Sequence, residues 1–169
     1  MFSGSKGDYD ENDTHDEQGC YGVSKSLGEM CCNSTIIRTS IIGEEKKNKY
    51  SLLEWVLSHS NKTINGYSNH HWNGLTCLQL SHVILYMINN NIYWNGVRHV
   101  HSPTPVSKYE LACMINSTYN LNNTVIPFTT DTYVNKTLST IHKDCILDKL
   151  NIPEISEQIS TQKLFSIHN

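Results

Sequence analysis

The stretch CYGVSKSLGE, residues 20–29, places a tyrosine and a lysine four positions apart. Residues at this spacing lie on one face of a helix, and the pattern predicts a helix from Tyr21 to about Met30. A tyrosine beside an ammonium group can donate a proton, because the positive charge favours the phenolate that is left behind. The spacing alone does not establish this chemistry, since an ordinary half-exposed helix face presents the same pair.

The sequence around this stretch predicts a loop before it and a strand after it. Residues 3–20 are rich in Gly, Asp, Asn and Glu and have no apolar period, which indicates a surface loop. STIIRTS at 34–40 is β-branched and apolar at its centre, so we expect a buried strand. Two further short strands are predicted at 97–102 and 124–128.

Helix starts are marked by three capping boxes, in which a hydroxyl residue is followed three positions later by Glu or Gln. The boxes pair Ser51 with Glu54, Thr76 with Gln79, and Ser107 with Glu110. The helices that they predict, with two more from apolar pattern, cover 51–59, 76–88, 107–119, 141–152 and 154–167. Helices that alternate with strands indicate an α/β fold.

Length and composition limit the function classes. The chain has 169 residues and a formal net charge of −3, which suits one domain and argues against nucleic acid as a partner. No apolar stretch approaches the roughly 20 residues that span a bilayer, so no membrane partner is expected. The polar, acidic residues 1–17 do not form a signal peptide, so we expect a cytoplasmic protein with reduced cysteines.

The histidines do not indicate a metal site. His70 and His71 are adjacent, and in a strand they point to opposite faces. His99 and His101 alternate and could share a face, but a solvent-facing or hydrogen-bonded pair is expected there rather than a ligand pair. We therefore predict no metal.

Fifteen residues between 2 and 40 follow one ordered pattern, a glycine- and acid-rich loop, then YGxSKxxGE, then a strand that ends in R-T-S. The matching residues are Phe2, Gly4, Gly7, Tyr9, Glu11, Asp13, Tyr21, Gly22, Ser24, Lys25, Gly28, Glu29, Arg38, Thr39 and Ser40. In this order they resemble the extended short-chain dehydrogenase/reductase family, and within it the dTDP-4-dehydrorhamnose reductase branch. The segments 72–84, 96–115 and 134–140 resemble later parts of the same branch.

The resemblance implies roles for four of these residues. Tyr21 would be the catalytic acid, and Lys25 would support it and hold the nicotinamide ribose. Thr39 and Ser40 would lie near the nicotinamide ring. The implied cofactor is NADP or NAD, and the implied activity is NAD(P)-dependent reduction of a 4-keto-6-deoxy nucleotide sugar.

The resemblance also implies a substrate site at Trp72, Asn73 and Gly74, near the sugar nucleotide. A tryptophan beside Asn-Gly is equally what an anchored turn looks like, so both interpretations stay open. Ile41 follows R-T-S where the branch often has an aromatic residue, and His15 and Glu17 replace prolines that are common in its acidic loop.

The glycine-rich cofactor motif of the family does not occur in this sequence, and its catalytic Ser/Thr would precede Met1. We therefore expect the C-terminal part of a Rossmann-type NAD(P)-binding fold, without the N-terminal βαβ half. Residues 1–60 would be a remnant of the Rossmann core, and residues 61–169 mostly a sugar-nucleotide-binding subdomain.

Whether such a chain is an enzyme is left open. The expected protein partner is a separate N-terminal half or a second copy of the chain. The alternative function is a non-catalytic sugar-nucleotide-binding or regulatory module, of the kind found in the regulatory subunit of methionine adenosyltransferase.

Overall fold

The structure is a computed structural model that describes residues 1–31, 33–142 and 149–168. Its helices are α1 (Cys20–Gly28), α2 (Leu52–Ser58), α3 (Cys77–Asn89), α4 (Lys108–Tyr119) and α6 (Ile155–His168). Its strands are β1 (Thr35–Arg38), β2 (Ile41–Ile42), β3 (Thr63–Tyr67), β4 (His70–Trp72), β5 (Leu75–Thr76), β6 (Gly96–His99), β7 (Val106–Ser107), β8 (Thr124–Phe128) and β9 (Val134–Asn135). None of the helices in the described part is long and apolar enough to cross a membrane.

Most of the strand pairs are parallel, which confirms the predicted α/β class. β1 pairs with β6, β2 with β5, and β3 with β8, each in parallel. Parallel neighbours need a crossover between them, and helices supply it, as α2 and α3 do between β1 and β6. β4 lies between an antiparallel β7 and a parallel β9.

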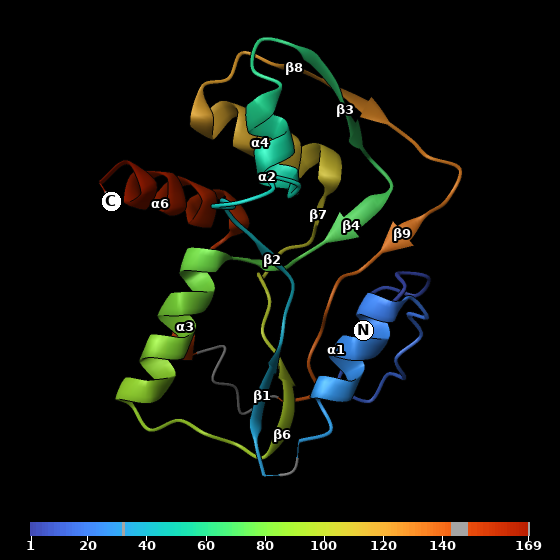
Figure 1. Cartoon of the computed structure of the whole chain (residues 1–169), viewed down its shortest axis with the longest axis vertical. Coiled ribbons are helices and arrows are strands. Elements are labelled where there is room, and N and C mark those ends of the chain that lie inside the picture. Colours follow the sequence, from blue (N-terminus) through green and yellow to red (C-terminus); the bar gives the residue numbers. More distant parts are fainter. Residues whose placement is uncertain (32, 143–148, 169) are drawn as a thin grey trace.

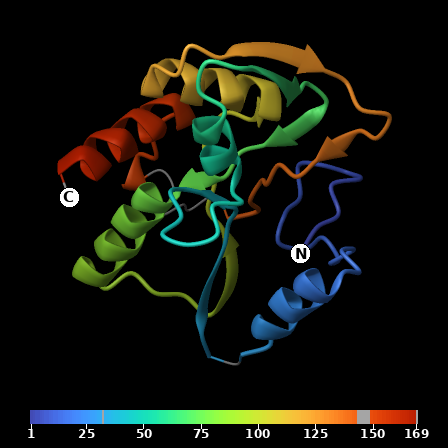
Figure 2. The same cartoon turned by 45° about the horizontal axis from the view of Figure 1, so that its top comes forward.

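Two apolar clusters hold these elements together. One cluster joins α2, α4 and α6 to β3 at the upper end of the view in Figure 1, with Val56 and Ile115 fully buried. The other lies around α3, with Leu75 and Val83 fully buried. In both views α3 and α1 lie on opposite sides of β1 and β6 (Figures 1 and 2).

The strongly patterned elements were predicted well and the short ones were missed. The helices expected at 51–59, 76–88, 107–119 and 154–167 are present, as is the β8 strand with its predicted bounds. Residues 143–148, in the helix expected at 141–152, lie outside the described residues. Strands β2, β4, β5, β7 and β9 were not predicted because they have only two or three residues, and β3, with the sequence TINGY, was missed because it is largely polar.

The three predicted capping boxes differ in the structure. Each N-cap hydroxyl accepts a hydrogen bond from the N3 backbone N–H, but only at Ser107 does the N3 side chain, Glu110, also reach back. Glu54 instead accepts from the Glu45 N–H at 2.9 Å and lies 3.6 Å from the Lys49 ammonium. The prediction that the Glu54 side chain bonds back to the Ser51 backbone N–H was therefore wrong, because a loop amide and a cation compete for the same carboxylate.

Replacing Ser107 with alanine is expected to lower the free energy of unfolding by about 1 kcal/mol, because it removes both halves of the cap of α4. Urea unfolding followed by circular dichroism measures this change. Ser51→Ala is the matched control and should cost less, since its bond to the Glu54 N–H is 3.4 Å long. Equal losses in the two variants would contradict the interpretation.

Candidate functional site

One cavity of about 610 Å³ brings together four of the residues singled out in the sequence. Tyr21 and Lys25 line it from α1, and Thr39 and Ser40 line it from the segment that follows β1. These residues are close in space because Glu29, directly after α1, is hydrogen-bonded to Arg38 at the end of β1; Figure 2 shows α1 to one side of β1. Their catalytic and cofactor roles stay predictions, but their common location is a property of the structure.

The Tyr21–Lys25 pair is formed on the open side of the cavity. The Lys25 Nζ lies 5.5 Å from the centre of the Tyr21 ring, as expected for residues one helical turn apart. Tyr21 is 67% exposed, and the one buried residue of α1 is Gly22, which packs closely against Glu17. A small residue here lets the helix approach the preceding loop while the face that carries Tyr21 stays accessible.

Trp72 and Gly74 hold Ser40 in place. The Trp72 Nε1–H donates to the Ser40 Oγ at 2.7 Å, and the Leu75 N–H donates to the Ser40 carbonyl at 2.8 Å. A Cβ at Gly74 would collide with that carbonyl and with the Trp72 ring, so only glycine fits. This close approach fixes one wall of the cavity.

Asn73 holds a second wall. Its side chain is buried and makes two hydrogen bonds with the backbone of Leu138, each 2.8 Å long. Leu138 lines the cavity, whereas Trp72, Asn73 and Gly74 are not among its lining residues. The three residues therefore contact the walls through Ser40 and Leu138, and their expected place near the substrate stays a prediction.

A chain of polar groups connects α1 to β1 and β6. Glu29, in the C-cap position of α1, receives two hydrogen bonds from the Arg38 guanidinium, at 3.0 and 2.6 Å. Arg38 also contacts the His99 Nε2 at 2.7 Å. The His99 Nδ1 faces the carbonyls of Tyr9 and Ser139 at 3.0 and 2.8 Å, so it carries the proton and Nε2 accepts from Arg38. Burial lowers the pKa of His99, which favours this neutral form.

Glu11 extends this series of polar groups on the far side of His99. Its carboxylate accepts hydrogen bonds from the backbone N–H groups of His99 and Ile141 and from the Thr140 hydroxyl, at 2.7 to 2.9 Å. Burial alone would raise the pKa of Glu11, but these hydrogen bonds outweigh it and lower the pKa to about 2. The carboxylate therefore pins the loop after β9 against β6.

The fold is expected to lose stability in acid through Glu11. Its folded-state pKa of about 2 lies below the ordinary value of 4.5, so its contribution is complete above pH 4.5 and is lost as the pH falls towards 2. Urea unfolding at several pH values should show that the free energy of unfolding falls less steeply with decreasing pH in Glu11→Gln than in the wild type. Glu157→Gln, at an exposed position on α6, is the control and should keep the wild-type slope. Equal slopes in the wild type and Glu11→Gln would contradict this role.

The polar chain was missed as a functional element, although its signal was present. Glu11, Glu29 and Arg38 all match the ordered pattern of the sequence, but no role was assigned to them. Glu29 and Arg38 line the cavity together with Phe2, whose ring lies 5.3 Å from the Arg38 guanidinium. A paired acid and base on consecutive elements could have suggested an ion pair.

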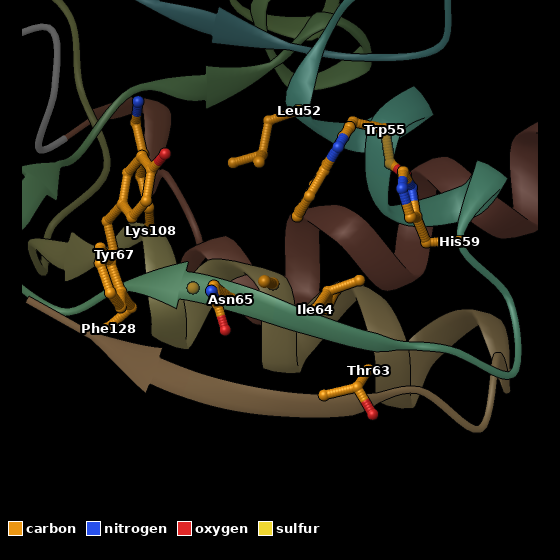
Figure 3. Close-up of a pocket in the computed structure, with 11 residues that line it drawn as sticks. Leu52, Trp55, His59, Thr63, Ile64, Asn65, Tyr67, Lys108 and Phe128 are labelled. Carbon is orange, nitrogen blue, oxygen red and sulfur yellow. The ribbon is translucent and has the colours of Figure 1, made fainter.

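A second cavity, of about 470 Å³, lies between α2, β3 and the start of α4 (Figure 3). Trp55 lines it from α2 and His59 from the C-cap position of that helix, and Tyr67 and Phe128 lie together at the other end with Lys108. No other strand pairs with β3 on the edge opposite β8 among the described residues. Sequence reasoning missed this cavity, because its residues come from four separate elements.

No cluster of three or more His, Cys, Asp or Glu side chains suitable for a metal occurs in the described part of the chain. His99 is buried in the polar chain, and the His101 Nδ1 contacts the Asn73 amide at 3.2 Å. Both histidines therefore have structural partners.

Comparison with known proteins identifies one family. The model of the family described as RmlD substrate binding domain matches residues 1–145. None of the curated proteins matches the chain at a significant level.

Solved structures share the fold. A dTDP-4-dehydrorhamnose reductase from Yersinia enterocolitica has a TM-score of 0.72 at 22% identity, over 94% of this chain and 60% of its own. A dTDP-4-dehydrorhamnose reductase from Bacillus anthracis str. Ames, in complex with NADP, has a TM-score of 0.72 at 21% identity, over 98% and 62%. MoeE5 in complex with UDP-glucose and NAD has a TM-score of 0.66 at 13% identity, over 98% and 61%. The chain thus spans between 60% and 62% of the length of these proteins.

Proposed function

Because the chain belongs to the RmlD substrate binding domain family, we propose that it takes part in the NAD(P)-dependent reduction of a 4-keto-6-deoxy nucleotide sugar. The observation that carries the proposal is the single cavity lined by Tyr21, Lys25, Thr39 and Ser40. A proton donor, its cationic neighbour and two hydroxyl groups are what the reduction of a ketone beside a bound cofactor requires.

Each of these residues has a proposed task. A nicotinamide cofactor supplies the hydride when bound. Tyr21 donates the proton to the keto oxygen of the sugar, and Lys25 stabilises the phenolate and holds the ribose hydroxyls of the cofactor. Thr39 and Ser40 face the nicotinamide side of the cavity. Trp72, Asn73 and Gly74 act by holding the Ser40 and Leu138 walls.

The residues of this cavity fit the nicotinamide end of the cofactor. Hydroxyl and ammonium groups gather in an open, partly apolar space whose walls are fixed by hydrogen bonds. The sequence contains no glycine-rich turn to cradle a pyrophosphate. We therefore propose that an N-terminal half with such a turn holds the rest of the cofactor.

The second cavity is proposed to receive the nucleotide base. Its aromatic walls suit stacking with a flat ring. MoeE5, which shares the fold, is described in complex with a nucleotide sugar.

We also propose a division of the chain that follows its two apolar clusters. The part around β1, β6 and α3 is the remnant of the Rossmann core, and the part around β3, α2 and α4 is the substrate subdomain. Val56 of α2 is buried in the same cluster as residues of β3 and α4, so a single boundary near residue 60 would divide that cluster.

The alternative is a non-catalytic module that binds a sugar nucleotide. The exposure of Tyr21 favours this alternative, because water around the proton donor weakens electrostatic catalysis. A rate assay separates the two functions. The purified chain is mixed with dTDP-4-dehydrorhamnose and NADPH or NADH, and cofactor oxidation is followed at 340 nm. Oxidation that depends on the sugar supports the reductase, whereas sugar-nucleotide binding without oxidation supports the module.

A further inference from the structure

Two lysines lie on either side of β4, directly after the strands that pair with it. In the β7–β4–β9 sheet, His71 is opposite Ser107 on one side and Asn135 on the other. Lys108 follows Ser107 and Lys136 follows Asn135. The Lys136 N–H also donates to the His71 carbonyl at 3.0 Å, so the pairing with β9 continues as far as Lys136.

Both lysines follow residues that pair with β4, Lys108 as the first residue of α4 and Lys136 directly after β9. Continued by one residue, the register sets Lys108 beside His70 and Lys136 beside Trp72. His70 and Trp72 are two positions apart, and their side chains therefore share a face. The contacts agree, since Lys136 lines the cavity that contains Ser40, the hydrogen-bond partner of Trp72.

Lys108 belongs to the second cavity. Its Nζ lies 5.9 Å from the centre of the Tyr67 ring, which is itself 4.8 Å from the His70 ring (Figure 3). Lys108 thus lines the second cavity and Lys136, with Lys25, lines the first, and the face of β4 that carries His70 and Trp72 lies between Lys108 and Lys136. Strand spacings put the two Cα atoms about 12 Å apart, and flexible four-carbon stems let both ammonium groups reach a ligand between them.

The positive charge here is poorly balanced. Burial and the charge of the nearby Lys136 lower the pKa of Lys108. Lys108 has no ion pair with any residue of the described part of the chain, and Lys136 has one long contact, 3.8 Å, with Glu17. Two neighbouring cations with one distant carboxylate form a site that an anion would stabilise.

We propose that Lys108 and Lys136 bind the diphosphate group of the nucleotide sugar, with the base in the second cavity and the sugar in the cavity of Tyr21. The assignment rests on the proposed function, which requires a substrate that extends from one cavity to the other. A diphosphate carries its charge over several oxygens and can accept hydrogen bonds from both ammonium groups at once. The two lysines would then set the position of the sugar relative to Tyr21.

The test is a calorimetric titration of the whole chain with inorganic pyrophosphate, dTDP and thymidine. The wild type should bind pyrophosphate, and should bind dTDP more tightly than thymidine. The double variant Lys108→Met/Lys136→Met should lose about 100-fold in affinity for dTDP, roughly tenfold for each charge-assisted hydrogen bond. Lys46→Met/Lys47→Met removes the same charge from an exposed loop and should bind like the wild type.

Two further measurements distinguish a loss of the two charges from misfolding of the methionine double variant. Lys108→Arg/Lys136→Arg keeps the charge and should retain most of the affinity, and binding by the wild type should weaken as salt rises. The proposal is overturned if pyrophosphate does not bind the wild type, or if the methionine double variant binds dTDP as well as the loop control does.

Failure of this site and failure of the reductase give different results. If the protein binds pyrophosphate through the two lysines but never oxidises the cofactor, the anion site is supported and the reductase function is contradicted. If the double variant reduces the sugar with the KM of the wild type, the reductase function is supported and the anion site is contradicted.

Discussion

Tyr21→Phe is expected to lower kcat for the reduction of dTDP-4-dehydrorhamnose by about 10²- to 10⁴-fold, with little change in KM. The substitution removes the hydroxyl group that donates the proton and leaves the ring beside Lys25. A proton transferred only in the transition state affects kcat and kcat/KM together and leaves substrate binding intact. Steady-state oxidation of the cofactor, measured over a range of sugar concentrations, gives both constants.

Tyr93→Phe is the matched control. Tyr93 is 62% exposed, lies after α3 and lines neither cavity, so its hydroxyl group should not affect the rate. A loss of less than about tenfold in Tyr21→Phe, or an effect confined to KM, would refute the role assigned to Tyr21.

The second large effect is expected from Arg38→Met, which should lower the free energy of unfolding by about 3 kcal/mol. The side chains of Arg38 and Glu29 are only 13% and 19% exposed, and they are joined by two hydrogen bonds. Removing the guanidinium leaves a partly buried carboxylate without its cation and the His99 Nε2 without its donor. Urea unfolding followed by circular dichroism measures the loss.

A double-mutant cycle separates the ion pair from general packing. Glu29→Gln alone should also destabilise the fold, and Arg38→Met/Glu29→Gln should lose clearly less than the sum of the two single variants. Strictly additive losses would show that the pair is not energetically coupled. The pair also lines the cavity and joins the end of α1 to β1, so its loss should move Lys25 relative to Thr39.

The sequence predicted those parts of the fold whose signals are local. α1, α4 and β8 have a helical or strand period and caps or turn residues at their ends, and their bounds were predicted closely. β4 and β5 are short, and their pairing with β9 and β2 comes from distant parts of the chain. Such contacts are set by tertiary packing, which a local pattern does not contain.

The sequence also indicated some residues of the candidate site, whereas the contacts between them could be seen only in the structure. Tyr21, Lys25, Thr39 and Ser40 were singled out through the resemblance to the reductase branch, because the spacing of Tyr21 and Lys25 does not establish their role by itself. That Trp72 holds Ser40, and that Asn73 holds Leu138, depends on the folding of β4 against residues far along the chain. The W-N-G segment therefore indicated a place near the site, but the structure was needed to show that these residues support its walls.

The most direct test of the central claim is a calorimetric titration of the purified chain with NADPH and with NADH, up to about 1 mM. If the cavity of Tyr21, Lys25, Thr39 and Ser40 is a nicotinamide site, the wild type gives saturable heat. Lys25→Met should weaken that binding about tenfold or more, because it removes a charge-assisted hydrogen bond to the ribose. Unchanged affinity in Lys25→Met would contradict the claim that this cavity is the nicotinamide site, and the absence of heat from the wild type would contradict the claim that this chain binds the cofactor without an N-terminal half.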